Sequence, residues 1–147
     1  MKVLAIDPAS LLGWAISRTL YGVWNLKTRK DESIGMKLIR LRAKLNELNL
    51  VEKIDVVVYE RPGGRHTNPI IHQAKLIGII EEWCEENKII YKAYSSKEIK
   101  KYATGNGNAS KEKMIQAASE KLGYCGNDDN EADALWLLEL FNNDYNN

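Results

Sequence analysis

Two short apolar runs, each ending in an acid, constrain the fold of this chain more than any other feature of its sequence. They are KVLAID at residues 2–7 and IDVVVYE at residues 54–60. Near-continuous apolar runs of this length are typical of strands that are buried on both faces. Sequential strands of this kind usually lie side by side and end at the same edge of a sheet. We therefore expect the carboxylates of Asp7 and Glu60 to converge.

The rest of the N-terminal half contains a hairpin pattern and a helix pattern. Residues 13–19 and 21–27 alternate polar with aromatic and β-branched side chains, which predicts two more strands joined by a turn near Leu20. Isoleucine and leucine then recur at steps of three and four, the spacing of one apolar helix face, from about Asp31 to Leu50. The pattern predicts three antiparallel strands followed by a helix.

The C-terminal half is predicted to alternate loops, helices and one further strand. Residues 61–69, RPGGRHTNP, are typical of a loop, and a helix at about 70–87 and a third buried strand at 88–94 follow. Three helices complete the chain, and the residues predicted to bound them are Ser95 or Ser96 with Gly105, Ser110 with Gly123, and Asn130 with Asn142. The polar tail after the last helix is predicted to fray.

The order of these elements predicts an α/β domain with a mixed five-stranded sheet and helices on both faces. The chain has 147 residues, of which 44% are hydrophobic and 28% are charged. This length and composition suit one core, so we expect a single domain over residues 1–147.

Several protein classes are excluded by what the sequence lacks. No stretch approaches the roughly 20 apolar residues that span a membrane, so we expect no membrane partner. Cys84 and Cys125 lie far apart without metal-ligand spacing, which excludes a disulfide framework and a zinc site and favours the reducing cytoplasm. Phosphate-loop, dinucleotide-binding and serine-hydrolase motifs are missing, so we expect no nucleotide cofactor.

The basic residues are clustered although the formal net charge is only +1. Residues 61–80 contain Arg61, Arg65 and Lys75 and no acid, and residues 96–113 contain five lysines against two glutamates. Clusters of this kind are typical of a nucleic-acid footprint. Solvated helix faces on a lysine-rich protein would explain either cluster equally well.

A third acid, Asp133, lies in the apolar helix pattern EADALWLL, where an unpaired carboxylate is costly to bury. With Asp7 and Glu60 it would supply three hard oxygen ligands, which suit Mg²⁺ or Mn²⁺. A pair of such ions roughly 4 Å apart stabilises the attacking and the leaving oxygen in phosphodiester hydrolysis. Simpler roles stay open: a cap before Pro8 for Asp7, a loop start for Glu60, and a first-turn helix acid for Asp133.

Four segments resemble the RuvC family of Holliday junction resolvases, especially the short versions found in bacteriophages. They are VLAIDPAS followed by GWAI, VVVYERP, ATGNGNASKEKM and DDNEADALWLL, and together they cover most of the chain. The resemblance implies a ribonuclease H-like fold. It also implies a metal-dependent endonuclease that cuts branched DNA and leaves 5′-phosphate and 3′-hydroxyl ends.

The resemblance also implies roles for individual residues. Asp7, Glu60 and Asp133 match the catalytic acids that bind two Mg²⁺ ions, for which Mn²⁺ can substitute, with Asp7 bridging the pair. Lys111 matches a lysine that serves catalysis and DNA contact, and Lys100 falls where the family often has another basic residue. With Arg61, Arg65 and Lys101, these lysines would grip the DNA backbone, so we expect affinity to fall with salt.

A homodimer is expected as well. The helix that begins near Ile70 resembles the family's dimer helix and carries more apolar side chains than one sheet face needs: Ile71, Leu76, Ile79, Ile80 and Trp83. A two-fold dimer would present two sites to the two strands of a branch. The expected location is the cytoplasm, or the host cytoplasm if a phage encodes the chain.

Two positions depart from the family pattern. Asn130 stands three residues before Asp133, where relatives often have an acid or a histidine. On a helix, Asp129 and Asn130 share a face with Asp133 whereas Glu131 does not, so Asp129 is the expected fourth ligand and Asn130 an accessory one. The loop after Glu60 lacks the aromatic side chain that stacks on a base in some relatives.

Two other functions stay open on the sequence alone. One is a ribonuclease H acting on RNA–DNA hybrids, which would need contacts to 2′-hydroxyl groups. The other is a non-catalytic protein that binds branched DNA, although the retained Asp7, Glu60 and Asp133 argue against it.

Overall fold

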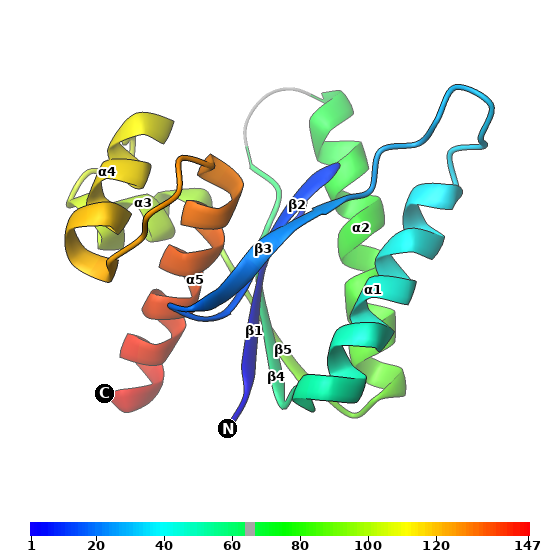
Figure 1. Ribbon diagram of the computed structural model, residues 1–147, viewed down its shortest axis with the longest axis horizontal. Coiled ribbons are helices and arrows are strands. Elements are labelled where there is room, and N and C mark those ends of the chain that lie inside the picture. Colours follow the sequence, from blue (N-terminus) through cyan, green and yellow to red (C-terminus); the bar gives the residue numbers. More distant parts are fainter. Residues whose placement is uncertain (64–66) are drawn as a thin grey trace.

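A five-stranded sheet lies between two layers of helices in the computed structural model (Figure 1). The structure describes residues 1–63 and 67–147. In chain order the elements are β1 (Val3–Asp7), β2 (Leu11–Ser17), β3 (Leu20–Asn25), α1 (Met36–Glu52), β4 (Val56–Glu60), α2 (Thr67–Glu86), β5 (Ile90–Tyr94), α3 (Ser96–Thr104), α4 (Lys111–Leu122) and α5 (Asp129–Asn146). The predicted order of strands and helices is confirmed.

The sheet is mixed, with strand order β3-β2-β1-β4-β5. The first three strands are antiparallel, whereas β1, β4 and β5 are parallel to one another. The two strands that end in acids, β1 and β4, are therefore neighbours in the middle of the sheet. This arrangement confirms the predicted fold class and the predicted pairing of these two strands.

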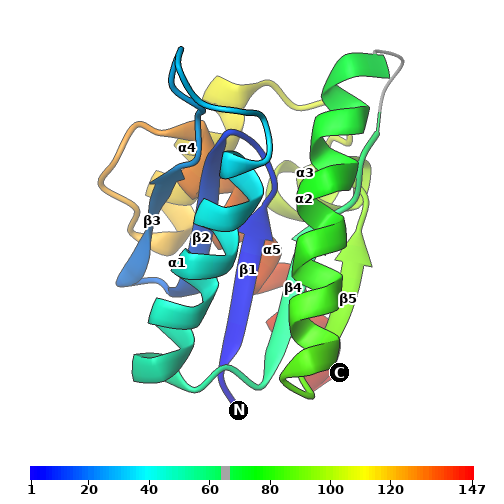
Figure 2. The ribbon, with the colours of Figure 1, turned by 90° about the vertical axis from the view of Figure 1, so that its right-hand side faces the viewer.

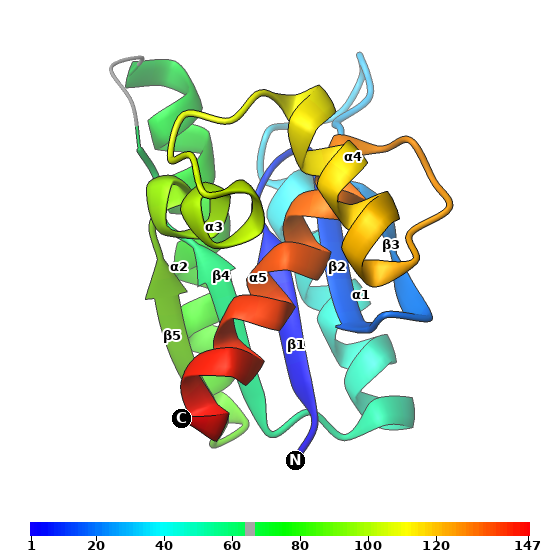
Figure 3. The same cartoon turned by 90° about the vertical axis from the view of Figure 1, so that its left-hand side faces the viewer.

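Side-chain alternation along the central strands builds one core on each face of the sheet. Leu4 and Ile6 of β1 pack in the core beneath α1 and α2, which Figure 2 shows in front of the sheet. Val3 and Ala5 pack in the opposite core, beneath α5 with α3 and α4 (Figure 3). A strand with a core on each face must be apolar throughout, which is why β1 and β4 have continuous apolar sequences.

The predicted start of the first helix, about Asp31, is wrong by five residues. The carboxylate of Glu32 accepts hydrogen bonds from the backbone N–H of Arg29, at 2.6 Å, and from the guanidinium of Arg40. These contacts favour a turn ahead of α1, and Ile34, predicted on the apolar helix face, is 60% exposed in that turn. Side-chain hydrogen bonds of this kind compete with helical backbone bonds.

Two further predictions are corrected at the C-terminal half. β5 is an edge strand rather than a fully buried one, and its Ile90 is 71% exposed. The tail predicted to fray is helical to Asn146, because Tyr94 of β5 donates a hydrogen bond to Asp144 at 3.0 Å. The predicted caps Ser95 and Ser110 are confirmed.

Among the described residues, no helix is long and apolar enough to cross a membrane.

Candidate active site

Asp7 and Glu60 lie next to each other at the end of the sheet where α1 and α2 begin. The register of β1 and β4 pairs Ile6 with Tyr59, one residue before each acid. Asp7 is buried, Glu60 is half-buried, and their carboxyl groups are hydrogen-bonded to one another. The predicted convergence of these two acids is present in the structure.

The first turn of α5 brings Asp133 to the same place. Asp128 caps the helix, and its carboxylate accepts hydrogen bonds from the backbone N–H groups of Asn130, at 2.8 Å, and Glu131, at 3.1 Å. The helix therefore begins early enough for Asp129 to share the face of Asp133. Asp133 is half-buried between Ala132 and Ala134, whose small side chains let α5 lie close to the sheet.

Gly13 permits the close approach of α5, and the sequence analysis did not identify it. It pairs with Asp7 across β1 and β2. A Cβ atom at Gly13 would stand 2.0 Å from the backbone carbonyl oxygen of Asn130, which no side chain could do. The glycine directly beside Asp7 in the sheet thus fixes where the acids of α5 lie.

Tyr124 is a second residue that the sequence analysis missed. Its hydroxyl lies 2.7 Å from a Glu131 carboxylate oxygen and 3.0 Å from the backbone N of Asp128. Because the ring is buried, these contacts fix the loop that enters α5. One of these contacts also holds the carboxylate of Glu131, the acid that helical spacing places farthest from the face of Asp133 and that is therefore the poorest candidate for a metal ligand.

Burial raises the pKa of both paired acids. For Asp7 the charges of Glu60 and Asp133 add to burial, so its pKa lies well above the usual range. For Glu60 burial is opposed by hydrogen bonds from Asp7 and Ser96 and by the positive charge of Lys100, and its pKa is raised nonetheless. Both shifts favour the protonated forms of these acids when no cation is bound.

Asp133 belongs to the same electrostatic cluster. Burial raises its pKa to about 7, with the charges of Glu60 and Asp129 acting in the same direction. The positive charges of Lys100 and Lys111 oppose the shift. Perturbed carboxyl groups gathered at a sheet edge are typical of a functional site.

These acids fit a divalent cation, although they stand as an open cluster. Within the described residues, no three acidic, histidine or cysteine side chains are close enough to hold an ion together. All donors are carboxylate oxygens, the ligands preferred by Mg²⁺ and Mn²⁺. Asp7, Glu60 and Asp133 would hold the ion, with Asp129 or Asn130 beside them.

Three of the basic residues predicted to grip DNA, Arg61, Lys100 and Lys111, lie around this cluster. Glu60, Arg61 and Lys100 line a cavity of about 630 Å³. The ammonium of Lys111 lies 3.6 Å from a carboxylate oxygen of Asp129 and is otherwise exposed. Lys101 lines a separate hollow of about 450 Å³ formed by α3 and the turn after it. Arg65 lies outside the described residues.

The raised pKa values predict how stability depends on pH and metal. The folded chain binds more protons than the unfolded chain at Asp7, Glu60 and Asp133, so the metal-free protein should lose stability from about pH 4 to about pH 7. A bound cation would offset this loss of stability, because it favours the ionised forms of the acids. With Mg²⁺ at about 100 times its Kd, we expect the Tm to rise roughly 5–10 °C at pH 8 and much less at pH 5. If thermal melts show the same Mg²⁺-induced rise in Tm at both pH values, the assignment of these acids as the metal site is contradicted.

The sheet order and the helices on both faces are those of a ribonuclease H-like fold. The chain matches no protein-family profile. Its fold is similar to that of Thermus thermophilus RuvC in complex with a Holliday junction substrate, with a TM-score of 0.75 and 22% identity over 95% of this chain and 92% of that one. It is also similar to a yeast mitochondrial Holliday junction resolvase, with a TM-score of 0.68 and 15% identity over 95% of this chain and 77% of that one.

Two curated proteins are similar in sequence, both named crossover junction endodeoxyribonuclease RuvC. The protein from Corynebacterium glutamicum is 28% identical over 95% of this chain and 67% of its own length. The protein from Corynebacterium efficiens is 26% identical over 84% of this chain and 59% of its own length. Sequence and fold thus point to the same relatives, the RuvC resolvases, which this chain resembles over most of its length. It spans about two thirds or less of the length of these two relatives.

Proposed function

We propose that this protein is a divalent-metal-dependent endonuclease that cuts branched DNA, with Holliday junctions as the leading substrate. The observation that carries the proposal is the cluster of Asp7, Glu60 and Asp133 at the end of the two central strands of a RuvC-family fold. Its relatives are named as crossover junction endonucleases, and one structural neighbour binds a Holliday junction.

In this reaction the acids would bind the metal and the lysines would bind the DNA phosphates. Mg²⁺, when bound, would lower the pKa of the attacking water and stabilise the leaving 3′ oxygen. Asp7, with Glu60, Asp133 and Asp129 acting on it, would hold the metal together with these acids. Lys111 and Lys100 lie within electrostatic reach of Asp133 and would hold the scissile phosphate against the acids. Arg61 and Lys101 would contact phosphates further along the strand.

The substrate class separates this proposal from its enzyme rival, a ribonuclease acting on RNA–DNA hybrids. A four-way junction, a fork, a linear duplex and a hybrid duplex of matched sequence would be incubated with the protein and Mg²⁺. We expect cleavage of the branched substrates at least about tenfold faster than of the others. Preferential cutting of the hybrid would favour the rival. Tight junction binding without cutting in Mg²⁺ would favour a non-catalytic role.

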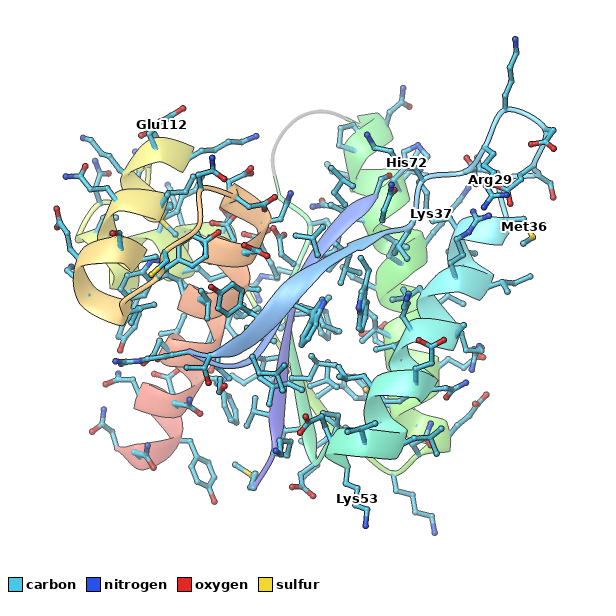
Figure 4. All side chains as sticks on the ribbon, in the orientation of Figure 1. Arg29, Met36, Lys37, Lys53, His72 and Glu112 are labelled. Atoms are coloured by element: carbon cyan, nitrogen blue, oxygen red, sulfur yellow. The ribbon has the colours of Figure 1, made fainter. Side chains whose placement is uncertain are left out.

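The fourth ligand gives a further expected result. We expect Asp129→Ala to raise the Mg²⁺ concentration needed for half-maximal cleavage by about tenfold, because Asp129 adds negative charge to the cluster. Asn130→Ala should have a smaller effect, and Asn130→Asp should lower the Mg²⁺ requirement. A silent Asp129→Ala beside an inactive Asn130→Ala would reverse the assignment. Glu112→Ala, on the exposed start of α4, is the control (Figure 4).

A homodimer is part of the proposal. Of the apolar residues of α2 expected at its interface, Leu76, Ile80 and Trp83 are buried in the chain's own core, whereas Ile71 is 45% exposed and Ile79 is only partly buried. Apolar side chains remain at the outer junction of α1 and α2, where Leu38, Ile39 and Ile79 line a shallow hollow.

The oligomeric state can be measured directly. We expect light scattering to give twice the chain mass at micromolar concentration, and Ile39→Glu, which places a charge in the hollow, to give a monomer. Leu50→Glu, on the same helix and 81% exposed outside the hollow, should leave the mass unchanged. A wild-type monomer, both free and on DNA, would contradict the dimer.

A further inference from the structure

Lys37 has an environment that the proposed reaction does not explain. It lies in the first turn of α1, and only 8% of its surface is exposed. Among the described residues, the buried charged or polar residues are Asp7 and Lys37. Its ammonium lies 3.1 Å from the hydroxyl oxygen of Ser10.

The positive charge of Lys37 has no negative partner in the described part of the chain. No carboxylate there lies within 4.0 Å of its ammonium. Ser10 accepts from one of three N–H groups and supplies no charge. Burying an ammonium without a counter-charge is costly, so buried lysines are rarely found unpaired. This environment lacks an anion.

The contact of Lys37 with Ser10 is not what mainly holds the segment between β1 and β2 in place. The backbone of that loop is already held from two sides: Leu26 donates its N–H to the Ser10 carbonyl at 2.8 Å, and Gln73 of α2 donates to the Pro8 carbonyl at 3.4 Å. A structural role for the ammonium would therefore duplicate contacts that the fold already has.

The position of Lys37 indicates which anion it would meet. Ser10 follows Asp7 by three residues, at the end of the molecule where the acids converge. Figure 4 shows Lys37 and His72 at this end, whereas Lys53, the C-cap of α1, lies at the opposite end. Lys100 and Lys111 come from α3 and α4, which belong to the other helical layer. Lys37 thus places a positive charge at the same end of the molecule as the acids, from the helical layer opposite that of Lys100 and Lys111.

We propose that the Lys37 ammonium binds a phosphate of the DNA strand on the α1 side of the acid cluster. The proposal rests on the proposed function, since DNA supplies the phosphate. One phosphate oxygen would supply the missing counter-charge while Ser10 keeps the ammonium in place. The strand would then be held from both helical layers, by Lys37 on one side and by Lys100 and Lys111 on the other.

The salt dependence of binding tests this role. A synthetic four-way junction would be titrated with protein in EDTA, so that binding is measured without cleavage, from 50 to 200 mM KCl. We expect Lys37→Met to weaken binding roughly tenfold at 100 mM KCl and to reduce the slope of log K against log salt by about 0.9 for each lost contact. The Tm should stay the same or rise, because an uncompensated buried charge has been removed.

Three further variants keep the test decisive. Lys37→Arg should retain the slope, Ser10→Ala should change it little, and Lys53→Met is the matched control on the same helix. If Lys37→Met does not fold, Lys37→Gln takes its place. An unchanged slope in Lys37→Met, with or without weaker binding, would overturn the proposal. Failure of the wild-type chain to bind the junction would contradict the proposed function itself, which separates the two failures.

Discussion

Asp7→Asn is expected to lower the single-turnover rate of junction cleavage by about 10³-fold or more. Asp7 ends the central strand, and the charges of Glu60, Asp133 and Asp129 act on it, so it would contact a cation bound by these acids. Removing a metal ligand forfeits several kcal/mol of transition-state stabilisation, and about 4 kcal/mol corresponds to 10³-fold in rate. The Kd for the junction in EDTA should change by less than about threefold, since the phosphate contacts lie elsewhere.

The same variant has a signature that does not depend on activity. Because burial and neighbouring charges raise the pKa of Asp7, its neutral amide replacement should raise the Tm of the metal-free protein at pH 8. Asp31→Asn, in the exposed loop before α1, should alter neither the rate nor the Tm. An Asp7→Asn protein that cuts at the normal rate in Mg²⁺ would remove Asp7 from the site.

Gly13→Ala is expected to have the second largest effect, although residue 13 contacts neither metal nor DNA in the proposed reaction. The new Cβ would stand 2.0 Å from the Asn130 carbonyl oxygen, and both partners belong to the backbone. The first turn of α5 must therefore shift away from β2, and Asp133 with it. A displacement of about 1 Å at reacting groups can cost about 10²-fold in rate, and overpacking costs about 1–3 kcal/mol of stability.

Gly78→Ala is the matched control for this change. Gly78 lies on the exposed face of α2, and a Cβ there meets nothing within 4 Å. Alanine should stabilise the helix by about 0.5–1 kcal/mol and leave cleavage unchanged. A Gly13→Ala protein with wild-type activity and Tm would show that α5 does not depend on this contact to place Asp133.

The sequence patterns that predicted the fold correctly are those with strong local causes. The apolar runs that end in Asp7 and Glu60 must be buried on both faces, so their place in the middle of the sheet followed. Ser95 and Ser110 bond to backbone N–H groups within three residues, so the helix starts they mark were predicted well.

Features that depend on distant partners were not predictable in this way. The last residues of α5 are helical because Tyr94 reaches Asp144 from fifty residues away in sequence. Burial of β5 could not be judged from its composition, because an edge position is a property of the whole sheet. Gly13 looks like an ordinary strand glycine until α5 is placed on it, although glycine inside a strand does signal close approach of another backbone. Lys37 likewise becomes informative only through its burial.

Metal-dependent cleavage of a four-way junction at a single site per strand tests the central claim most directly. End-labelled junction at a concentration below that of the protein would be followed by single-turnover gel assay in Mg²⁺, in EDTA, and in EDTA followed by excess Mg²⁺. We expect cutting near the branch point with 5′-phosphate ends in Mg²⁺, none in EDTA, and full recovery on Mg²⁺ addition. Cleavage that persists in EDTA, or an intact junction in saturating Mg²⁺ despite tight binding, would contradict the assignment of the acid cluster as a nuclease site.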